Sequence, residues 1–236
     1  MVRLDKFLVG AGVGTRSEVK KYIKKNQVTV NGSSLVKPEQ KIDAENDCVC
    51  YAGEKIIYEE YSYYLFHKPA GCVTAKTDKR DQTVMDYFPE NYKKNFSPVG
   101  RLDKDTEGLL IITNDGDFHH RLVSPSYHVE KTYEAVLDAP VPEEAVELFA
   151  EGIDIGDEKK TLPARLTVCR NNRCEARLIL TEGRFHQVKR MFLAVGCKVI
   201  YLRRISIGNL SLGDLPKGKY RKLTESEIQD LKKDRR

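Results

Sequence analysis

The middle of the chain contains the stretch that most limits how it can fold, GRLDKDTEGLLIITNDG at residues 100–116. Its first half carries alternating carboxylates at 103, 105 and 107, and its second half contains the aliphatic run 109–112. Such a run, bounded by turn-forming residues, is typical of a buried strand. It is the longest aliphatic run present and falls far short of the roughly 20 residues that span a bilayer, so we expect no integral membrane protein.

The composition is that of an ordinary soluble globular protein. Apolar residues make up 40% of the 236 positions and charged residues 32%, which excludes a disordered chain, a collagen-like repeat and a coiled coil. The length allows one large domain, or a large domain and a small one. The six cysteines form no Cys-x-x-Cys pair and no trio of histidines has ligand spacing, so we expect reduced thiols, no metal site and a cytoplasmic location.

The first 60 residues are expected to form a small unit that begins with two helices. Apolar residues at 4, 7 and 8 predict a short helix, and the capping-box spacing in 15–18 predicts the start of a second one. Lysines cover the part of the second helix that its apolar stripe leaves free. The segment 3–25 holds seven basic and two acidic residues, a net charge of +5.

The remainder of this unit is expected to be a small β structure. Residues 28–30 alternate as a strand, Asn31-Gly32 predicts a hairpin turn, and 35–36 begins the return. Residues 49–57 form a further strand region, and we place the linker to the rest of the chain at Glu59-Glu60.

Beyond the linker the pattern is richer in strands. Strands are expected at 63–66, 109–112 and 131–137, and as a hairpin of 164–168 and 176–180. Helices are expected over 143–150 and 185–195. The last 20 residues carry eight basic and four acidic side chains and are expected to form a partly frayed tail.

Positive charge is concentrated a second time near the end of the expected second domain. Residues 184–204 contain six basic side chains and no acidic one. Two such concentrations, in a chain whose net charge is only +5, indicate two contacts with a polyanion.

The alternating carboxylates at 103, 105 and 107 allow three interpretations. Their spacing fits the first half of an EF-hand loop, but loop position 12 would be Asn114 instead of a bidentate Glu, and a strand follows where a helix is needed. A glycosidase needs carboxylates on both sides of a sugar ring, which residues two apart on one segment cannot supply. The third interpretation is a polar loop that enters a buried strand and has no chemical role.

Four segments together resemble one known family, the RNA pseudouridine synthases. Residues 100–116 are similar to its signature, and the Thr-Asn-Asp-Gly ending resembles the branch that acts on small-subunit ribosomal RNA. Residues 68–71 resemble the Lys-Pro-x-Gly motif of the family, and residues 182–191 resemble its basic C-terminal motif. The first 60 residues resemble the S4 RNA-binding domain, so the resemblance covers essentially the whole chain.

The resemblance implies a fold of the α+β class with two domains. Residues 1–60 would form a small S4-type α/β RNA-binding domain. Residues 61–236 would form a pseudouridine synthase catalytic domain with a mixed, mostly antiparallel sheet flanked by helices. The implied enzyme is an rRNA isomerase that detaches uracil from ribose, rotates it and rejoins it through C5, with no cofactor.

The resemblance also implies three catalytic residues. Asp103 matches the catalytic aspartate, which acts at the sugar or at the ring only when it is ionised. Lys189 matches the basic partner that would keep a buried carboxylate ionised. Tyr133 matches the active-site tyrosine, whose ring could stack on the target base and whose hydroxyl could take part in proton transfer.

The resemblance further implies how RNA is bound. The target uridine must leave its stack to reach Asp103, and we expect Arg101 to occupy the vacated space. The other residues expected to bind RNA are Arg184, His186 and Arg190 in the C-terminal motif, and Arg3, Lys6, Arg16, Lys20, Lys21 and Lys24 in the S4-like domain.

The expected partner is 16S ribosomal RNA within a small-subunit assembly intermediate. We expect the protein to act as a monomer, with no membrane contact, no metal and no small-molecule cofactor. Three alternatives stay open at this point. They are a 23S rRNA pseudouridine synthase, a non-catalytic RNA-binding or ribosome-assembly protein on the same fold, and a metal-dependent nucleic-acid enzyme.

Overall fold

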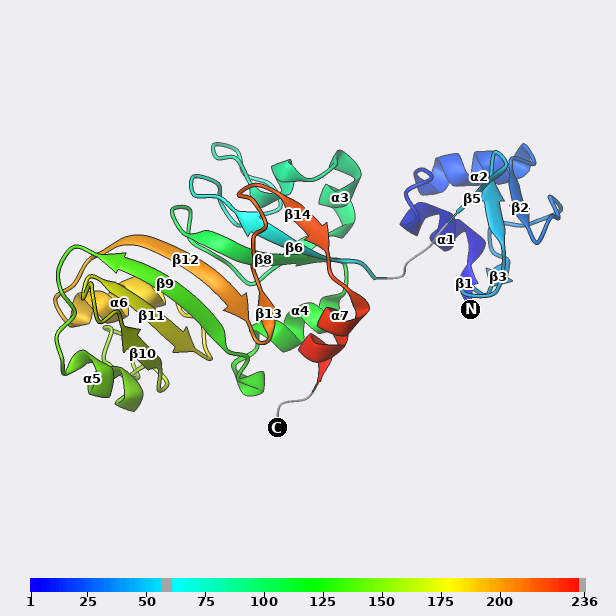
Figure 1. The fold of residues 1–236 in the computed structure, drawn as a ribbon. Coiled ribbons are helices and arrows are strands. Elements are labelled where there is room, and N and C mark those ends of the chain that lie inside the picture. The colour runs from blue at the N-terminus through cyan, green and yellow to red at the C-terminus, as the bar shows by residue number, and fades with distance from the viewer. Residues whose placement is uncertain (57–60, 234–236) are drawn as a thin grey trace. The chain divides into compact units, whose positions relative to one another are not determined.

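The structure is a computed structural model that describes residues 1–56 and 61–233 (Figure 1). The chain divides into two compact units, Met1–Ser62 and Tyr63–Arg236. The linker expected at Glu59-Glu60 lies outside the described residues.

The first unit contains the two predicted helices and several short strands. Its elements are β1 (Val2–Arg3), α1 (Leu4–Gly10), α2 (Arg16–Lys24), β2 (Val28–Val30), β3 (Lys41–Ile42), β4 (Val49–Tyr51) and β5 (Glu54–Lys55). The capping box that begins α2 is confirmed, because the Thr15 amide donates to Glu18 at 2.7 Å and the Glu18 amide donates to the Thr15 hydroxyl at 3.3 Å. Phe7 and Val19 belong to the buried cluster that joins the helices to the strands.

The strand pairing of this unit differs from the expectation. The turn at Asn31-Gly32 forms, but Val30 meets only Ser33 across it, in a single isolated bridge. The expected return at 35–36 is wrong: the Leu35 side chain is 91% exposed, and β2 pairs with β4 instead. The chain leaves the turn to form β3, which pairs with β1. The expected strand region 49–57 is a hairpin, β4 and β5, that reverses at Ala52-Gly53.

The second unit is built on one large sheet. Its elements are β6 (Tyr63–Lys68), the 3₁₀ helix η1 (Val84–Tyr87), α3 (Glu90–Asn95), β7 (Ser97–Val99), β8 (Glu107–Thr113), α4 (Gly116–Val123), the 3₁₀ helix η2 (Pro125–Tyr127), β9 (Lys131–Leu137), α5 (Ala145–Glu151), β10 (Arg165–Val168), β11 (Glu175–Leu180), α6 (Gln187–Ala194), β12 (Val199–Ile207), β13 (Leu210–Ser211), β14 (Tyr220–Lys222) and α7 (Glu225–Lys232).

The sheet is mixed and mostly antiparallel, as predicted. Its strand order is β10-β11-β9-β12-β8-β6-β14, with β13 on β12 and β7 on β8. The pairing of β12 with β8 is parallel, and the other pairings among the described strands are antiparallel. At this parallel junction Gly108 has φ +113°, and a Cβ atom there would lie 2.2 Å from the Arg204 carbonyl oxygen. Glycine therefore lets β8 and β12 meet.

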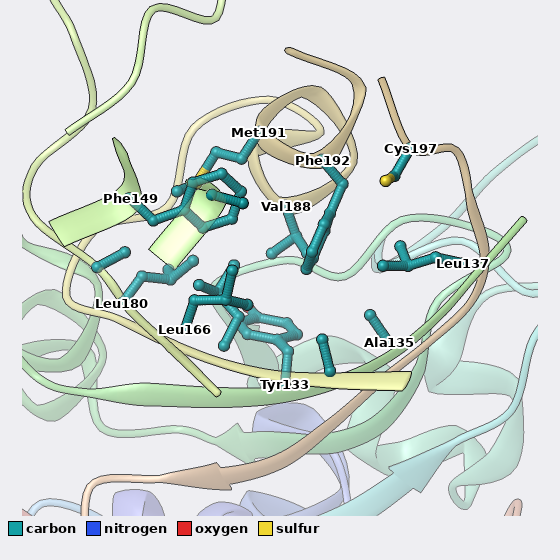
Figure 2. Packing of buried hydrophobic residues seen from close by; sticks show 14 of the residues in the cluster. Tyr133, Ala135, Leu137, Phe149, Leu166, Leu180, Val188, Met191, Phe192 and Cys197 are labelled. Atoms are coloured by element: carbon teal, nitrogen blue, oxygen red, sulfur yellow. The ribbon is translucent and has the colours of Figure 1, made fainter. Parts of the chain in front are cut away.

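The two halves of the sheet are covered differently. The predicted strand 109–112 lies within β8, where all residues are buried. One face of β6 and β8 packs with α4 and α7, and the other packs with η1. In β9, by contrast, burial alternates. Figure 2 shows the covered face of this half, where Val188 and Phe192 of α6 pack towards Ala135 and Leu137 of β9.

The expectation of a frayed tail is wrong. Residues 220–222 form β14, which pairs with β6, and residues 225–232 form α7. Thr224 begins this helix with a capping box, and Ile228 and Leu231 are buried in the cluster beneath β6 and β8. The high charge of the segment obscured the helical spacing of these two apolar residues.

Candidate active site

Asp103 lies in the loop that joins β7 to β8. Beneath this loop the fully buried Lys68 ammonium donates to the carbonyl oxygens of Pro69, Lys104 and Thr106 at 3.0, 3.2 and 2.8 Å. Burial lowers the pKa of Lys68. Lys68 therefore fixes the backbone on both sides of Asp105 from below.

Two further contacts hold the same loop. The Thr74 hydroxyl donates to the Leu102 carbonyl at 2.7 Å and accepts from the Leu102 amide at 3.2 Å. The Gly71 amide donates to the Lys104 carbonyl at 2.7 Å. The segment 68–71 thus serves as a platform for Asp103, a role that the sequence did not reveal.

Lys189 and His186 both approach the Asp103 carboxylate. The Lys189 ammonium lies 3.6 Å from Asp103 Oδ2 and 2.5 Å from Asp105 Oδ1, and His186 Nε2 lies 3.6 Å from Asp103 Oδ1. Burial opposes the ionisation of Asp105, but the hydrogen bond and the charge of Lys189 together hold the pKa of that carboxyl below its ordinary value. Lys189 is therefore shared by two carboxylates.

The start of α6 explains why Lys189 points to the loop. The predicted helix 185–195 begins at Gln187, and His186 precedes it with φ 47° in the left-handed region. Gln187 fixes this turn by accepting from the Arg184 amide at 2.9 Å and donating to Glu182 at 2.7 Å. The buried Val188, Met191 and Phe192 side chains point into the core (Figure 2). Lys189 lies on the other side of the helix, where it reaches Asp103 and Asp105.

A pocket of about 340 Å³ opens beside Asp103. Its wall includes Arg101, Asp103, Lys131, Tyr133, His186 and Arg204. The structure thus brings Asp103 and Tyr133 to one cavity, with Lys189 beside Asp103 and outside the residues that line the pocket.

Tyr133 is joined to a residue that the sequence analysis counted only as part of a basic segment. Arg204 of β12 is the cross-strand partner of Tyr133 in β9, so the two side chains share a face. Arg204 Nη1 lies 3.4 Å from the Tyr133 hydroxyl, and the guanidinium carbon lies 5.9 Å from the ring centroid. Arg204 Nε donates to the Leu109 carbonyl at 2.8 Å. The sequence gives no sign that Arg204 belongs to the site. Arg203 and Arg204 are adjacent arginines, and only their burial distinguishes them.

The rim of the pocket contains an exposed cation and an exposed aromatic pair. Arg101 is exposed and forms no hydrogen bond or ion pair within the part of the chain that the structure describes. Phe185 is 71% exposed and stacks on His186 with 3.8 Å between ring centroids. This aromatic pair offers a second flat surface at the rim.

Arg184 and Arg190, which we expect to contact RNA, are both bound to groups of the protein. Arg184 donates to Glu182, Asp157 and two backbone carbonyls. Arg190 donates to Asp157 and to the carbonyls of Ile155 and Phe185. Their donors are occupied by the protein itself, and Arg184 lines the pocket, while the contact of either residue with RNA stays a prediction.

The basic residues of the first unit also fall into two groups. Arg3 forms a two-point contact with the buried Asp5 carboxylate, at 3.0 and 2.9 Å. The other residues of this unit that we expect to bind RNA are exposed and form no ion pair among the described residues; they are Lys6, Arg16, Lys20, Lys21 and Lys24. The expected lysine-rich surface of α2 is therefore present.

Two of the three alternating carboxylates, Asp103 and Asp105, meet at Lys189, and Glu107 does not. Glu107 is bound by Lys217 at 2.7 Å and by the Tyr201 hydroxyl at 2.8 Å, apart from the Asp103–Lys189 contact. Across residues 1–56 and 61–233 no group of three or more His, Cys, Asp or Glu side chains could hold a metal ion. Over the same ranges, no helix is long and apolar enough to cross a bilayer.

Comparisons with known proteins agree with this geometry. Residues 62–194 match the family model described as RNA pseudouridylate synthase, and residues 2–48 match that of the S4 domain. The chain is 42% identical to the "Uncharacterized RNA pseudouridine synthase YtzG" of Bacillus subtilis, with 98% of each chain covered. It is 40% identical to the "Ribosomal small subunit pseudouridine synthase A" of Escherichia coli (strain K12), with 98% of this chain and 100% of the relative covered. A solved structure titled "Crystal structure of pseudouridylate synthase" superposes with a TM-score of 0.70 at 39% identity and covers 98% of this chain and 100% of the other.

Proposed function

This chain belongs to the RNA pseudouridylate synthase family and is an isomerase, and we propose that it converts a specific uridine of 16S ribosomal RNA to pseudouridine. The observation that carries the chemistry is the pocket that unites Asp103 and Tyr133 beside Lys189. The choice of RNA is supported by relatives that are about 40% identical and are named for the small ribosomal subunit.

Asp103 is the catalytic residue of this proposal. The reaction breaks the bond between uracil N1 and ribose C1′, and an ionised carboxylate can stabilise or attack the electron-poor centre that results. Lys189 places a positive charge 3.6 Å from Asp103 Oδ2. Tyr133 presents its ring to the base and its hydroxyl to the proton transfers. No electron acceptor or phosphate donor takes part, so the reaction needs no cofactor.

The target uridine enters the pocket by leaving its stack. A folded RNA cannot bring the C1′ atom of a stacked nucleotide to a carboxylate inside a pocket. Arg101 is exposed at the rim and has no hydrogen-bond or ion-pair partner in the described part of the chain, which suits it to fill the space that the base vacates. His186, stacked on Phe185, offers the neighbouring nucleotide a contact.

The first unit binds RNA through the exposed cations of α1 and α2. The five cations without a partner are Lys6, Arg16, Lys20, Lys21 and Lys24. Contacts of this kind are made to phosphates and fix position without reading sequence. The proposed substrate is a small-subunit assembly intermediate, bound by a monomer.

The test is a map of pseudouridine in 16S and 23S rRNA from cells that lack the protein. We expect one 16S site to be lost and to be restored by the wild-type chain and by Asp117→Ala, whose carboxylate is exposed on α4. Asp103→Ala should not restore it, because the rate falls by on the order of 10³-fold or more when charge stabilisation at the reacting centre is lost.

Each other result contradicts a specific part of the proposal. Restoration by Asp103→Ala would remove Asp103 from the chemistry. Loss of a 23S site instead would mean that the substrate is the rRNA of the large subunit. No change in either rRNA would favour a protein that binds RNA without modifying it.

A further inference from the structure

Two cations at the floor of the pocket have no anionic partner. Arg204 is only 2% exposed, and its guanidinium contacts the Leu109 carbonyl and the Tyr133 hydroxyl, while Nη2 has no partner. The Lys131 ammonium donates to the Val129 carbonyl at 2.9 Å. Among the described residues neither cation forms an ion pair, although every other buried or half-buried arginine of the segment 184–204 has a carboxylate partner.

This arrangement is unfavourable without a ligand. Buried charges in proteins are normally paired, because removing a cation from water is unfavourable unless an anion or hydrogen bonds replace the water. Burial and the charge of Arg204 lower the pKa of Lys131 to about 8. The floor is therefore organised to receive negative charge that the protein does not supply.

The position of the two cations limits which part of an RNA can reach them. A backbone phosphate is joined to the chain on both sides and stays near the rim, where Arg101 and Phe185 are exposed. The base is the part of a flipped nucleotide that can descend to the floor, beside the Tyr133 ring. The anion that fits is consequently one that forms on the base.

We propose that Arg204 and Lys131 stabilise the uracil anion that exists while the base is detached from ribose. The inference rests on the proposed function and adds two residues to it. When the N1–C1′ bond breaks, its electron pair stays on uracil and spreads over N1, O2 and O4. The C5–C1′ bond then forms with an electron pair of the same anion, C5 loses its proton and N1 gains one, so the product is an isomer of the substrate.

The symmetry of uracil suits a fixed pair of donors. A half-turn about the axis through N3 and C6 exchanges N1 with C5 and O2 with O4. A donor that holds O2 before the rotation therefore finds O4 in the same place afterwards. Arg204 is locked by Leu109 and Tyr133, so it can hold one carbonyl oxygen without moving.

The test compares variants on two RNAs made by transcription, 16S rRNA with uridine and 16S rRNA with 5-fluorouridine throughout. Fluorine at C5 stabilises the uracil anion by itself, so an enzyme that has lost its anion-stabilising groups should lose less on this substrate. We expect Arg204→Gln to slow single-turnover conversion of uridine by roughly 10²-fold with little change in Kd. On the fluorinated RNA, C5 has no proton to lose, so the C-glycoside is completed by addition of water at C6 and is heavier by one water. When this product is followed by mass spectrometry of the digested RNA, the same variant should be slowed about tenfold or less.

Three further variants make the comparison specific. Lys131→Met should show the same pattern with a smaller defect, and Arg204→Lys should recover part of the rate. Arg203→Gln is the matched control, because Arg203 lies on the opposite face of β12 and pairs with Glu134 at 2.7 Å. Arg203→Gln should convert both RNAs at nearly the wild-type rate. If Arg204→Gln fails to fold, Lys131→Met still tests the inference.

Two outcomes overturn the inference while the proposed function stands. Equal defects on both RNAs would mean that Arg204 only packs against Tyr133. A weaker Kd with an unchanged single-turnover rate at saturation would mean that the cations hold a phosphate. A wild-type chain that converts no uridine in 16S rRNA would instead overturn the proposed 16S activity, and this inference with it.

Discussion

Two segments of this protein contain a similar number of basic residues but differ in how those residues are exposed and paired. Residues 3–25 contain seven basic side chains, and all except Arg3 are exposed without an ion pair among the described residues. Residues 184–204 contain six, and four of them, Arg184, Lys189, Arg190 and Arg203, are bound to carboxylates. Arg204 is buried, and Lys198 alone of the six is exposed without such a partner.

The difference separates two uses of positive charge. Exposed lysines remain solvated and attract a polyanion from a distance, with an energy that salt screens. Arginines with fixed partners hold loops in place, and cations in a water-poor pocket act on charge that develops there. Counting basic residues in the sequence therefore did not distinguish the exposed cations of residues 3–25 from the paired and buried cations of residues 184–204.

The largest expected effect comes from the second segment. Lys189→Met removes the cation shared by Asp103 and Asp105, so two neighbouring carboxylates remain without compensation. We expect the rate at saturating RNA to fall about 10²-fold. RNA affinity should change little. Lys189→Arg, which keeps the charge, should retain most of the rate, and a methionine variant as active as the wild type would contradict the assignment.

A smaller effect is expected from the first segment, and on binding alone. Replacing Lys20, Lys21 and Lys24 by Gln removes three exposed charges from α2. The Kd for 16S rRNA should weaken on the order of tenfold, and the slope of log K against log salt should fall by about 2 to 3. The rate at saturation should not change.

The matched control for this triple variant removes the same charge elsewhere in the unit. Lys37, Lys41 and Lys55 are exposed and lie outside α1 and α2. If their replacement by Gln changed the salt slope as strongly as the α2 variant does, binding would depend on the overall charge of the unit and not on this helix.

The features found from the sequence are those with a local pattern. Strand 131–137 coincides with β9 because burial alternates along it, and β8 was found as an aliphatic run. The strand between them, β12, was missed, since Arg203 and Arg204 interrupt its apolar pattern. Its place depends on pairing with β9 on one side and β8 on the other, which no local signal encodes.

The same limit applies to the site. Asp103, Tyr133 and Lys189 were identified by resemblance, and the structure brings Asp103 and Tyr133 to one pocket, with Lys189 beside Asp103. Lys68 and Arg204 were not identified as site residues, because their importance comes from burial among backbone carbonyls and against Tyr133. A sequence shows that a residue is charged, but it does not show whether that residue is exposed to water.

The smallest effect is expected for Arg3. It is the one cation of residues 3–25 that is bound to a carboxylate, as most cations of residues 184–204 are. The hydrogen bond from Arg3 chiefly holds the pKa of the buried Asp5 carboxyl below its ordinary value, against the cost of burial. The stability that this contact contributes is present above the ordinary carboxyl pKa and is lost as pH falls through the lowered value. Arg3→Gln should raise the Asp5 pKa, so the first unit should begin to unfold at a higher pH on acidification. A ¹³C NMR titration of the Asp5 carboxyl in the full chain measures this directly. The salt slope of RNA binding should stay at the wild-type value, whereas a fall like that of the α2 variant would show that Arg3 contacts phosphate as the sequence alone suggested.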